Sequence, residues 1–145
     1  MRHHTIHLFL AASLSLPTVA TAQTAAPAGK KISVELNKLE SVPNACRGYF
    51  VIGNGTTDAL KELRLDVFLF DKAGVILRRV GLNFTDIRPE RSKVVLFDIP
   101  DVSCGDIGRL IVNDVLACNG SSGTPLPDCA SLVTTSTRAE ATFVY

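Results

Sequence analysis

The sequence predicts an all-β domain, a single immunoglobulin-like β-sandwich of about seven antiparallel strands held by two disulfides. Short segments in which apolar and polar residues alternate are separated by clusters of Gly, Pro, Asn and Asp. This alternation is typical of half-buried strands, and no segment beyond the first 22 residues shows a helical period. The same part of the chain holds four cysteines, an even number that suits a disulfide framework.

The first predicted strand covers residues 31–40, because Ile32, Val34 and Leu36 alternate with polar residues. The second covers residues 46–53. The connection between them contains Pro-Asn and has room for one helical turn. Asn54-Gly55-Thr56 ends the second strand, and we interpret this tripeptide as a turn rather than as a glycosylation site.

Leucine and valine at alternate positions predict the third strand, residues 63–69. The Asp-Lys-Ala-Gly sequence at 71–74 predicts a hairpin turn in which Gly74 takes a left-handed conformation. The fourth strand, residues 75–84, follows this turn and leads to a second turn at Arg-Pro-Glu, residues 88–90. A hairpin therefore joins the third and fourth strands.

The fifth predicted strand, residues 93–99, ends at Pro100, which cannot continue a sheet ladder. The sixth, residues 109–118, is rich in Ile, Val and Leu. A loop rich in Gly, Ser and Pro separates it from the seventh, residues 131–145, in which threonine and other strand formers are frequent. The predicted β-sandwich domain thus spans residues 32–145.

Residues 1–22 have the features of a cleaved signal peptide. A positive start is followed by the mostly apolar residues 6–19 and by Ala-Thr-Ala at residues 20–22, which suits signal peptidase. The alternative is a membrane anchor, but the apolar run is shorter than the ~20 residues that a spanning helix needs. We therefore expect export to the periplasm, no membrane span after cleavage, and a flexible lead over residues 23–31.

Removal of this signal peptide would also remove His3, His4 and His7, which are all the histidines of the chain. Histidine-dependent nucleophiles and histidine metal sites would then be excluded. Loss of Arg2 lowers the Lys+Arg count from 15 to 14, equal to the 14 Asp+Glu. A formally neutral domain has no electrostatic footprint for nucleic acid, so we expect no nucleic-acid partner.

Residues 50–112 resemble the small extracellular sandwich domains of the FxLYD type. The matching pieces are Val-Ile-Gly-Asn-Gly-Thr at 51–56, the strand at 63–71 with its Asp-Lys-Ala-Gly turn, and Ile-Arg-Pro at 87–89. The chain from residue 23 onward also resembles uncharacterised exported proteins of Gram-negative bacteria. The resemblance implies a sandwich fold and a periplasmic setting, and it brings no catalytic residues. The four cysteines depart from the FxLYD pattern.

Spacing alone leaves three ways to pair the four cysteines. Cys46 opens the second strand, and Cys104 lies in the loop that follows the fifth strand, the expected sheet neighbour of the second, so both cysteines lie at one end of the sandwich. Cys118 and Cys129 close the sixth strand and open the seventh at the other end. We therefore predict Cys46–Cys104 and Cys118–Cys129. A zinc site or a redox pair is disfavoured because no CxxC motif is present.

Two polar interruptions of apolar strands are candidate structural or binding sites. Arg78 shares the parity of the apolar positions of its strand, so it either points inward or follows a β-bulge. Both devices protect edge strands from aggregation, and ligand binding is the alternative. Asn113 and Asp114 interrupt the sixth strand, where we predict a buried, hydrogen-bonded pair that tethers a loop, with a ligand contact as the second possibility.

Three aspartates near the fifth and sixth strands, Asp98, Asp101 and Asp106, lack the ligand spacing of an EF-hand. We interpret them as turn and cap residues and expect no metal and no cofactor. Paired carboxylates on one strand face and a serine in a nucleophile setting are both missing from the sequence. We therefore name no catalytic residue and expect a protein that is not an enzyme.

The strongest surface signal lies on the third and sixth strands. Phe68 and Phe70 take the positions opposite to the leucines that face the core. Ile111 and Val115, which share one parity of the sixth strand, are predicted to join them in an outward apolar patch. Either a partner protein or another part of the chain covers this patch.

These observations predict a non-enzymatic periplasmic protein–protein interaction module, an accessory of a cell-envelope complex. One alternative is a structural or assembly subunit of the envelope that self-associates through an exposed strand edge. The other is a small hydrolase, for which the sequence shows no recognisable catalytic constellation.

Overall fold

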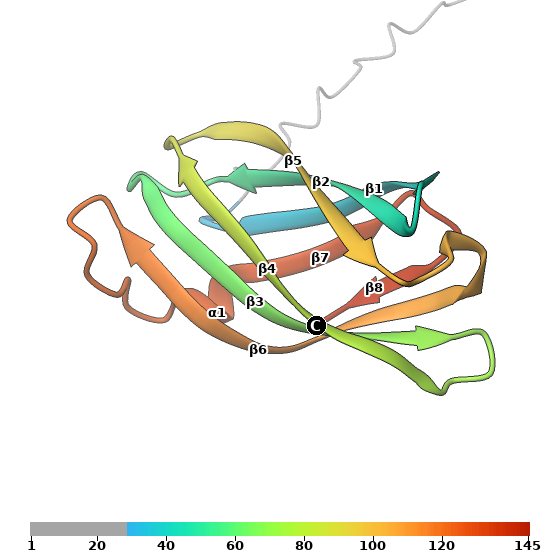
Figure 1. Ribbon diagram of the computed structural model, residues 1–145. Helices are drawn as coiled ribbons and strands as arrows, with labels where there is room; N and C mark the ends of the chain where they lie inside the picture. The colour runs from blue at the N-terminus through green and yellow to red at the C-terminus, as the bar shows by residue number, and fades with distance from the viewer. Residues whose placement is uncertain (1–28) are drawn as a thin grey trace, which may run out of the picture.

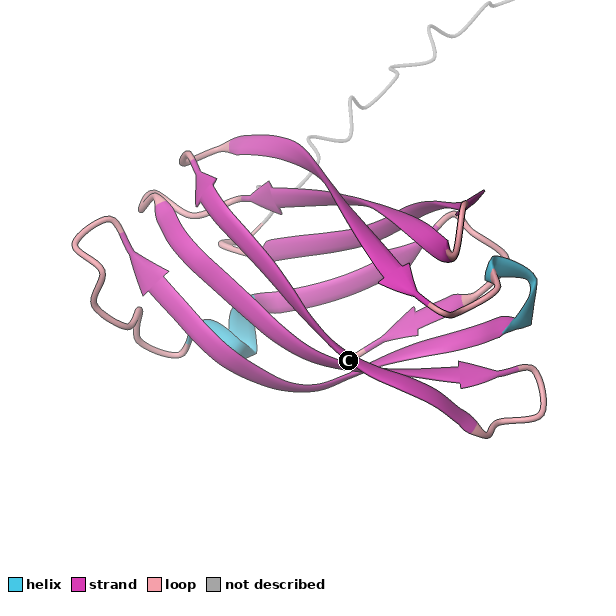
Figure 2. Ribbon diagram, in the orientation of Figure 1, coloured by secondary structure: helices cyan, strands magenta, loops and turns pink. Residues whose placement is uncertain are grey.

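Two four-stranded sheets pack face to face, so the predicted β-sandwich is confirmed (Figure 1). The computed structural model describes residues 29–145; the predicted signal peptide and most of the predicted lead lie outside the described residues. Helical segments are short within this range (Figure 2). The elements are β1 (Ile32–Val42), β2 (Ala45–Asn54), β3 (Leu60–Asp71), β4 (Ile76–Ile87), β5 (Arg91–Pro100), the 3-10 turn η1 (Cys104–Asp106), β6 (Ile107–Gly120), α1 (Cys129–Leu132), β7 (Val133–Thr137) and β8 (Thr142–Val144).

The first sheet has the strand order β5-β2-β1-β7, and the second has the order β4-β3-β6-β8. The first six strands correspond to the predicted ones, with ends that differ by a few residues. The predicted seventh strand is instead divided between the sheets. Its first part, β7, runs parallel to β1, and its last part, β8, runs parallel to β6. Residues 29–145 therefore form eight strands, and two of the strand pairs, β1–β7 and β6–β8, are parallel.

The crossing between β7 and β8 is held by hydrogen bonds around Thr137. Its Oγ1 lies 2.9 Å from the carbonyl oxygen of Ala141 and accepts a hydrogen bond from the backbone N–H of Ala139 at 3.1 Å. The N–H of Arg138 donates to the carbonyl of Leu36 in β1. These contacts end the pairing of β7 and direct the chain into the second sheet. Strand composition does not reveal such a crossing, because both halves of the segment favour extended structure.

The core lies between the sheets and is centred on Phe50 of β2. Its ring packs edge to face against Phe84, Phe97 and Phe143, with ring centroids 6.1, 5.7 and 5.8 Å away. These aromatic residues come from β4, β5 and β8, so the cluster ties both sheets together. Alternate residues of β2 are buried, as expected for a strand with one face on the core.

The hairpin predicted at residues 71–74 is confirmed. Gly74 has a φ of +86°, and Asp71 Oδ1 accepts hydrogen bonds from the N–H groups of Ala73 and Val75 at 2.9 and 2.8 Å. The prediction that the connection before β2 has room for a helical turn is wrong. Val42 pairs with Ala45, which leaves a two-residue turn in which Asn44 is left-handed with a φ of 59°.

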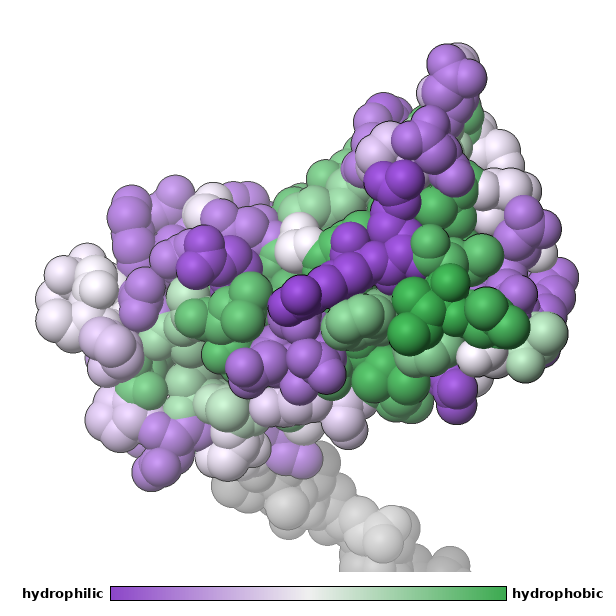
Figure 3. All heavy atoms as spheres, turned by 60° about the horizontal axis from the view of Figure 1, so that its bottom comes forward, coloured by the Kyte–Doolittle hydropathy of each residue, from purple (hydrophilic) through white to green (hydrophobic). Residues whose placement is uncertain are grey.

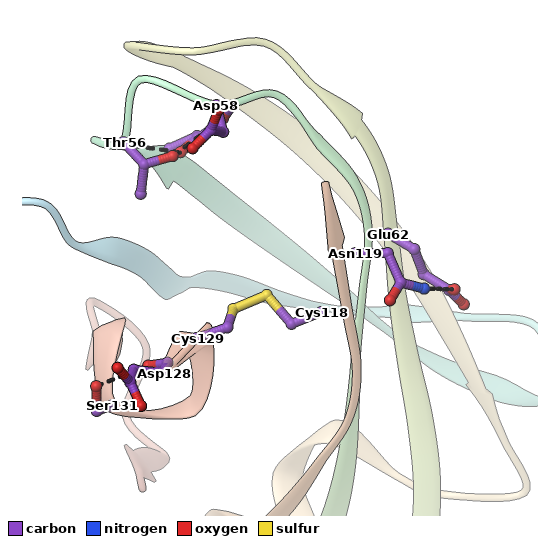
Figure 4. The surroundings of a disulfide bond; sticks show 9 residues. Thr56, Asp58, Glu62, Cys118, Asn119, Asp128, Cys129 and Ser131 are labelled. Carbon is purple, nitrogen blue, oxygen red and sulfur yellow. Dashed lines mark hydrogen bonds between the residues drawn. A yellow bond between two sulfur atoms is a disulfide. The ribbon is translucent and has the colours of Figure 1, made fainter. Parts of the chain in front are cut away.

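Both predicted disulfides are confirmed, Cys46–Cys104 and Cys118–Cys129. For Cys118–Cys129, however, the structure brings the two cysteines together in a different way from the one predicted. Cys118 lies on β6 of the second sheet, whereas Cys129 lies on α1, directly before β7 of the first sheet (Figure 4). This disulfide therefore joins the two sheets rather than two neighbouring strands.

Candidate functional site

The outer face of the second sheet, which points away from the first sheet, carries an apolar patch. We call it the outer patch and define it by Phe68, Phe70, Ile76, Ile111 and Val144. The strand register sets these residues side by side, because Phe68 pairs with Ile111, Ile111 with Val144, and Phe70 with Ile76. All four strands of the sheet contribute. Ile76 is 54% exposed and Val144 is 43% exposed, while Phe68, Phe70 and Ile111 are half-buried.

Two arginines cover part of the outer patch. The guanidinium of Arg79 lies 5.5 Å from the ring centroid of Phe68, and that of Arg109 lies 5.1 Å from the ring centroid of Phe70. Such cation–π contacts hold the arginines against the rings and shield the ring faces from water. Hydrophilic residues accordingly run between apolar areas on this side of the molecule (Figure 3). The chain thus covers its own patch in part, and Ile76 and Val144 remain exposed.

Val115 does not belong to the outer patch, so the prediction that it shares a face with Ile111 is wrong. Val67 pairs with Val112, but the preceding Asp66 pairs with Asp114. The register shift leaves one extra residue in β6 and exchanges the two faces of the strand until a second shift, between Arg64 and Leu65 of β3, restores them. Val115 therefore lies opposite Leu65 and packs against the core.

The residue in the bulge is Asn113, and its side chain reaches Asp66 on the outer face of β3. Asn113 Nδ2 donates to Asp66 Oδ2 at 2.9 Å. Asn113 and Asp114 are both exposed, so the prediction of a buried pair that tethers a loop is wrong. The polar residues mark a β-bulge, and Asp114 Oδ1 accepts a hydrogen bond from the N–H of Val115 beside it at 2.8 Å.

Asp66 is the centre of a polar cluster beside the outer patch, and a single aspartate at an outward strand position gives no signal of this in the sequence. Its side chain is only 4% exposed. Arg79 binds both carboxylate oxygens, with Nε–Oδ1 at 2.7 Å and Nη2–Oδ2 at 3.1 Å. The hydrogen bond from Arg79 is the main cause that lowers the pKa of Asp66, and Asn113 adds to the effect against the opposing effect of desolvation. The cluster fixes the arginine that covers Phe68.

Arg78 combines both of the predicted possibilities. The pairing of β3 with β4 shifts between Leu69, opposite Arg78, and Phe70, opposite Ile76, so a bulge precedes the arginine. Arg78 itself lies on the side of the buried Leu69, half-buried, with its guanidinium 3.5 Å from the carboxylate of Asp101. β4 is an edge strand, and both features oppose pairing with another chain.

A cleft of about 410 Å³ lies apart from the outer patch, between β1, η1 and the β7–β8 crossing. Two of its cationic residues are already paired: Lys38 with Glu40 at 2.7 Å and Arg138 with Glu35 at 3.2 Å. Across residues 29–145 no group of three or more His, Cys, Asp or Glu is placed to hold a metal ion. In the same range we find no helix of the length and apolarity needed to cross a bilayer.

The fold and the disulfides define this chain as a two-sheet β-sandwich with one disulfide at either end. No family model matches the sequence, and no curated protein matches it. A solved structure that resembles it comes from a structural characterization of IrmA from Escherichia coli. The two chains are 18% identical, with a TM-score of 0.56, and the match covers 72% of this chain and 90% of IrmA. At this level of identity the likeness concerns the fold alone.

Proposed function

We propose that the protein is an exported, non-enzymatic interaction module that binds a partner protein of the cell envelope through the outer patch. The observation that carries this proposal is the continuous set of apolar residues across all four strands of the second sheet, with Ile76 and Val144 exposed. Contiguous exposed apolar surface rimmed by polar residues is typical of protein–protein binding sites.

Two features support export to an oxidising compartment such as the periplasm. All four cysteines of the described chain are joined in disulfides, which persist outside the cytosol and are rare inside it. The first 22 residues also have the composition of a signal peptide. Both features are expected for a module that works in the envelope.

Arg109 indicates the chemistry of the partner. Its guanidinium stacks on Phe70, and within residues 29–145 it forms no ion pair. An arginine held against an aromatic ring presents its donors in a fixed direction, and such residues are frequent among those that dominate binding energy. We therefore propose a partner surface with a central apolar side chain flanked by a carboxylate that reaches Arg109.

The test is capture of the partner from a periplasmic extract, followed by titration with the purified partner. Phe70→Ser and Ile76→Ser should each weaken binding by about tenfold or more, the loss expected for a residue central to an interface. Ile76→Ser should leave the melting temperature within about 2 °C, because the side chain is more than half exposed. Arg109→Ala should weaken binding and reduce its dependence on salt.

The matched control is Val94→Ser, which changes an apolar residue that is 57% exposed on the first sheet. This variant should bind the partner as the natural protein does. If Ile76→Ser and Arg109→Ala both fold and bind with unchanged affinity, the outer patch is not the docking surface and the proposal is refuted.

A further inference from the structure

The edge strands β4 and β5 lie on the same side of the sandwich, where a turn joins them, and these two edges are built differently. On the opposite side the chain passes from β7 into β8 and so connects the sheets. β4 is interrupted by a bulge and carries Arg78. β5 pairs with β2 over its whole length, Arg91–Pro100, without a register shift and with no proline before its last residue.

β5 therefore has the more regular edge of the two, and its cationic residues Arg91 and Lys93 are confined to the half next to the β4–β5 turn. Its outward residues Val94 and Leu96 are 57% and 46% exposed. β4 approaches it near the turn that joins them, where Lys93 Nζ donates to the carbonyl oxygen of Thr85 at 2.8 Å. Beyond that turn the two strands diverge (Figure 1). A strand with free backbone groups and exposed apolar side chains is a template for another strand.

We propose that β5 pairs antiparallel with β5 of a second copy, so that the first sheets of two molecules join into one continuous sheet. The register that suits this pairing is centred on Val95. It sets Val94 opposite Leu96 of the second copy on the outer face, twice because of the two-fold symmetry, and it pairs nearly the whole strand.

Neighbouring registers are less favourable. A shift by one residue would place outward side chains against inward ones. A shift by two residues would place Val94 opposite Asp98 in one direction and Leu96 opposite Ser92 in the other. The chosen register instead sets Ser92 opposite Asp98 of the second copy, a hydroxyl beside a carboxylate.

The proposal identifies the second copy as the occupant because the edge is complementary to itself. It does not depend on the outer patch, which lies on the other sheet. The expectation from the sequence that self-association would use an exposed strand edge is thereby assigned to β5.

Cysteine cross-linking tests the register. Residues directly opposite each other in antiparallel strands have Cα atoms about 4.5–5.5 Å apart, within the span of a disulfide. Val94→Cys mixed with Leu96→Cys should give a cross-linked dimer under mild oxidation, and each variant alone should give much less. The natural cysteines do not interfere, because all four are already in disulfides. Cross-linking of either variant alone in preference to the mixture would overturn the proposed register.

Sedimentation equilibrium tests the dimer itself. The natural protein should show a monomer–dimer equilibrium, and Leu96→Lys should raise the dimer dissociation constant by about tenfold or more, because two lysines would face the joint sheet. Leu116→Lys is the matched control, since Leu116 is 47% exposed but lies on β6. Phe70→Ser should dimerise normally even if it loses the envelope partner. A natural protein that stays monomeric up to its solubility limit refutes the proposal.

Discussion

Replacement of Asn54 by alanine should destabilise the protein far more than its place in a turn suggests. The residue is 1% exposed. Its amide nitrogen donates to the carbonyl oxygens of Asp58 and Ile87 at 2.8 and 3.3 Å, and its Oδ1 accepts from the N–H and the hydroxyl of Thr56 at 3.0 and 2.7 Å. Ile87 ends β4 of the second sheet, so this one side chain connects the two sheets.

The magnitude follows from these four hydrogen bonds. A hydrogen bond contributes about 1 kcal/mol net, and a buried group that loses its partner costs about 1–3 kcal/mol. The contact with Ile87 is long, and the groups of the loop regain water in part, so the free energy of unfolding should fall by about 2–4 kcal/mol. For a domain of this size the melting temperature should fall by about 10 °C.

Urea denaturation followed by far-ultraviolet circular dichroism measures this loss, and the chain has no tryptophan to report by fluorescence. Thr56→Val should cost less, because it removes the hydroxyl contacts and keeps the backbone N–H that Asn54 accepts. Thr57→Ala is the control: this exposed neighbour should change the stability by less than about 0.5 kcal/mol. A loss below about 1 kcal/mol for Asn54→Ala would falsify the reasoning, since the buried network would then contribute little.

Two further predictions concern the disulfides and pH. The two disulfides join cysteines separated by 58 and 11 residues. In urea denaturation, removal of Cys46–Cys104 by paired serine substitutions should lower the free energy of unfolding by about 4 kcal/mol, and removal of Cys118–Cys129 by about 3 kcal/mol. The opposite order would contradict the loop-closure argument. Residues 29–145 contain no histidine, so the melting temperature of this domain should stay nearly constant from about pH 5 to 8 and fall below about pH 4. The reason is that several carboxylates have a lower pKa in the folded state than in the unfolded state. Their stabilising effect is fully present above the unfolded pKa and is lost as the pH falls through the folded pKa. Asp66→Asn should weaken this acid dependence. These carboxylates are Glu40, Asp66, Asp86 and Asp98.

Local features of the sequence are sufficient to predict most strands, their turns and the disulfide pairs. The alternation of apolar residues in β2 and β3 reports which side faces the core, because successive side chains of a strand point to opposite faces. Gly74 and Asp71 predict the β3–β4 turn, because the turn needs one residue in the left-handed conformation and one carboxylate that accepts backbone hydrogen bonds. Turn residues also mark the ends of strands in the sequence, so cysteines that lie at the same end of the sandwich can be paired from the sequence.

Tertiary structure alone decides the features that depend on a partner strand. The β-bulge at Asn113 moves Val115 from the outer patch to the core, and only the register against β3 reveals it. The crossing from β7 to β8 rests on contacts of Thr137 with residues of another strand and of its own turn. The sequence pattern predicts that Asp66 is an exposed polar residue. In the structure Arg79 and Asn113, from the two neighbouring strands, bind its carboxylate. Periodicity assigns a residue to a face, but register, bulges and burial depend on residues far away in the sequence, which the local pattern does not contain.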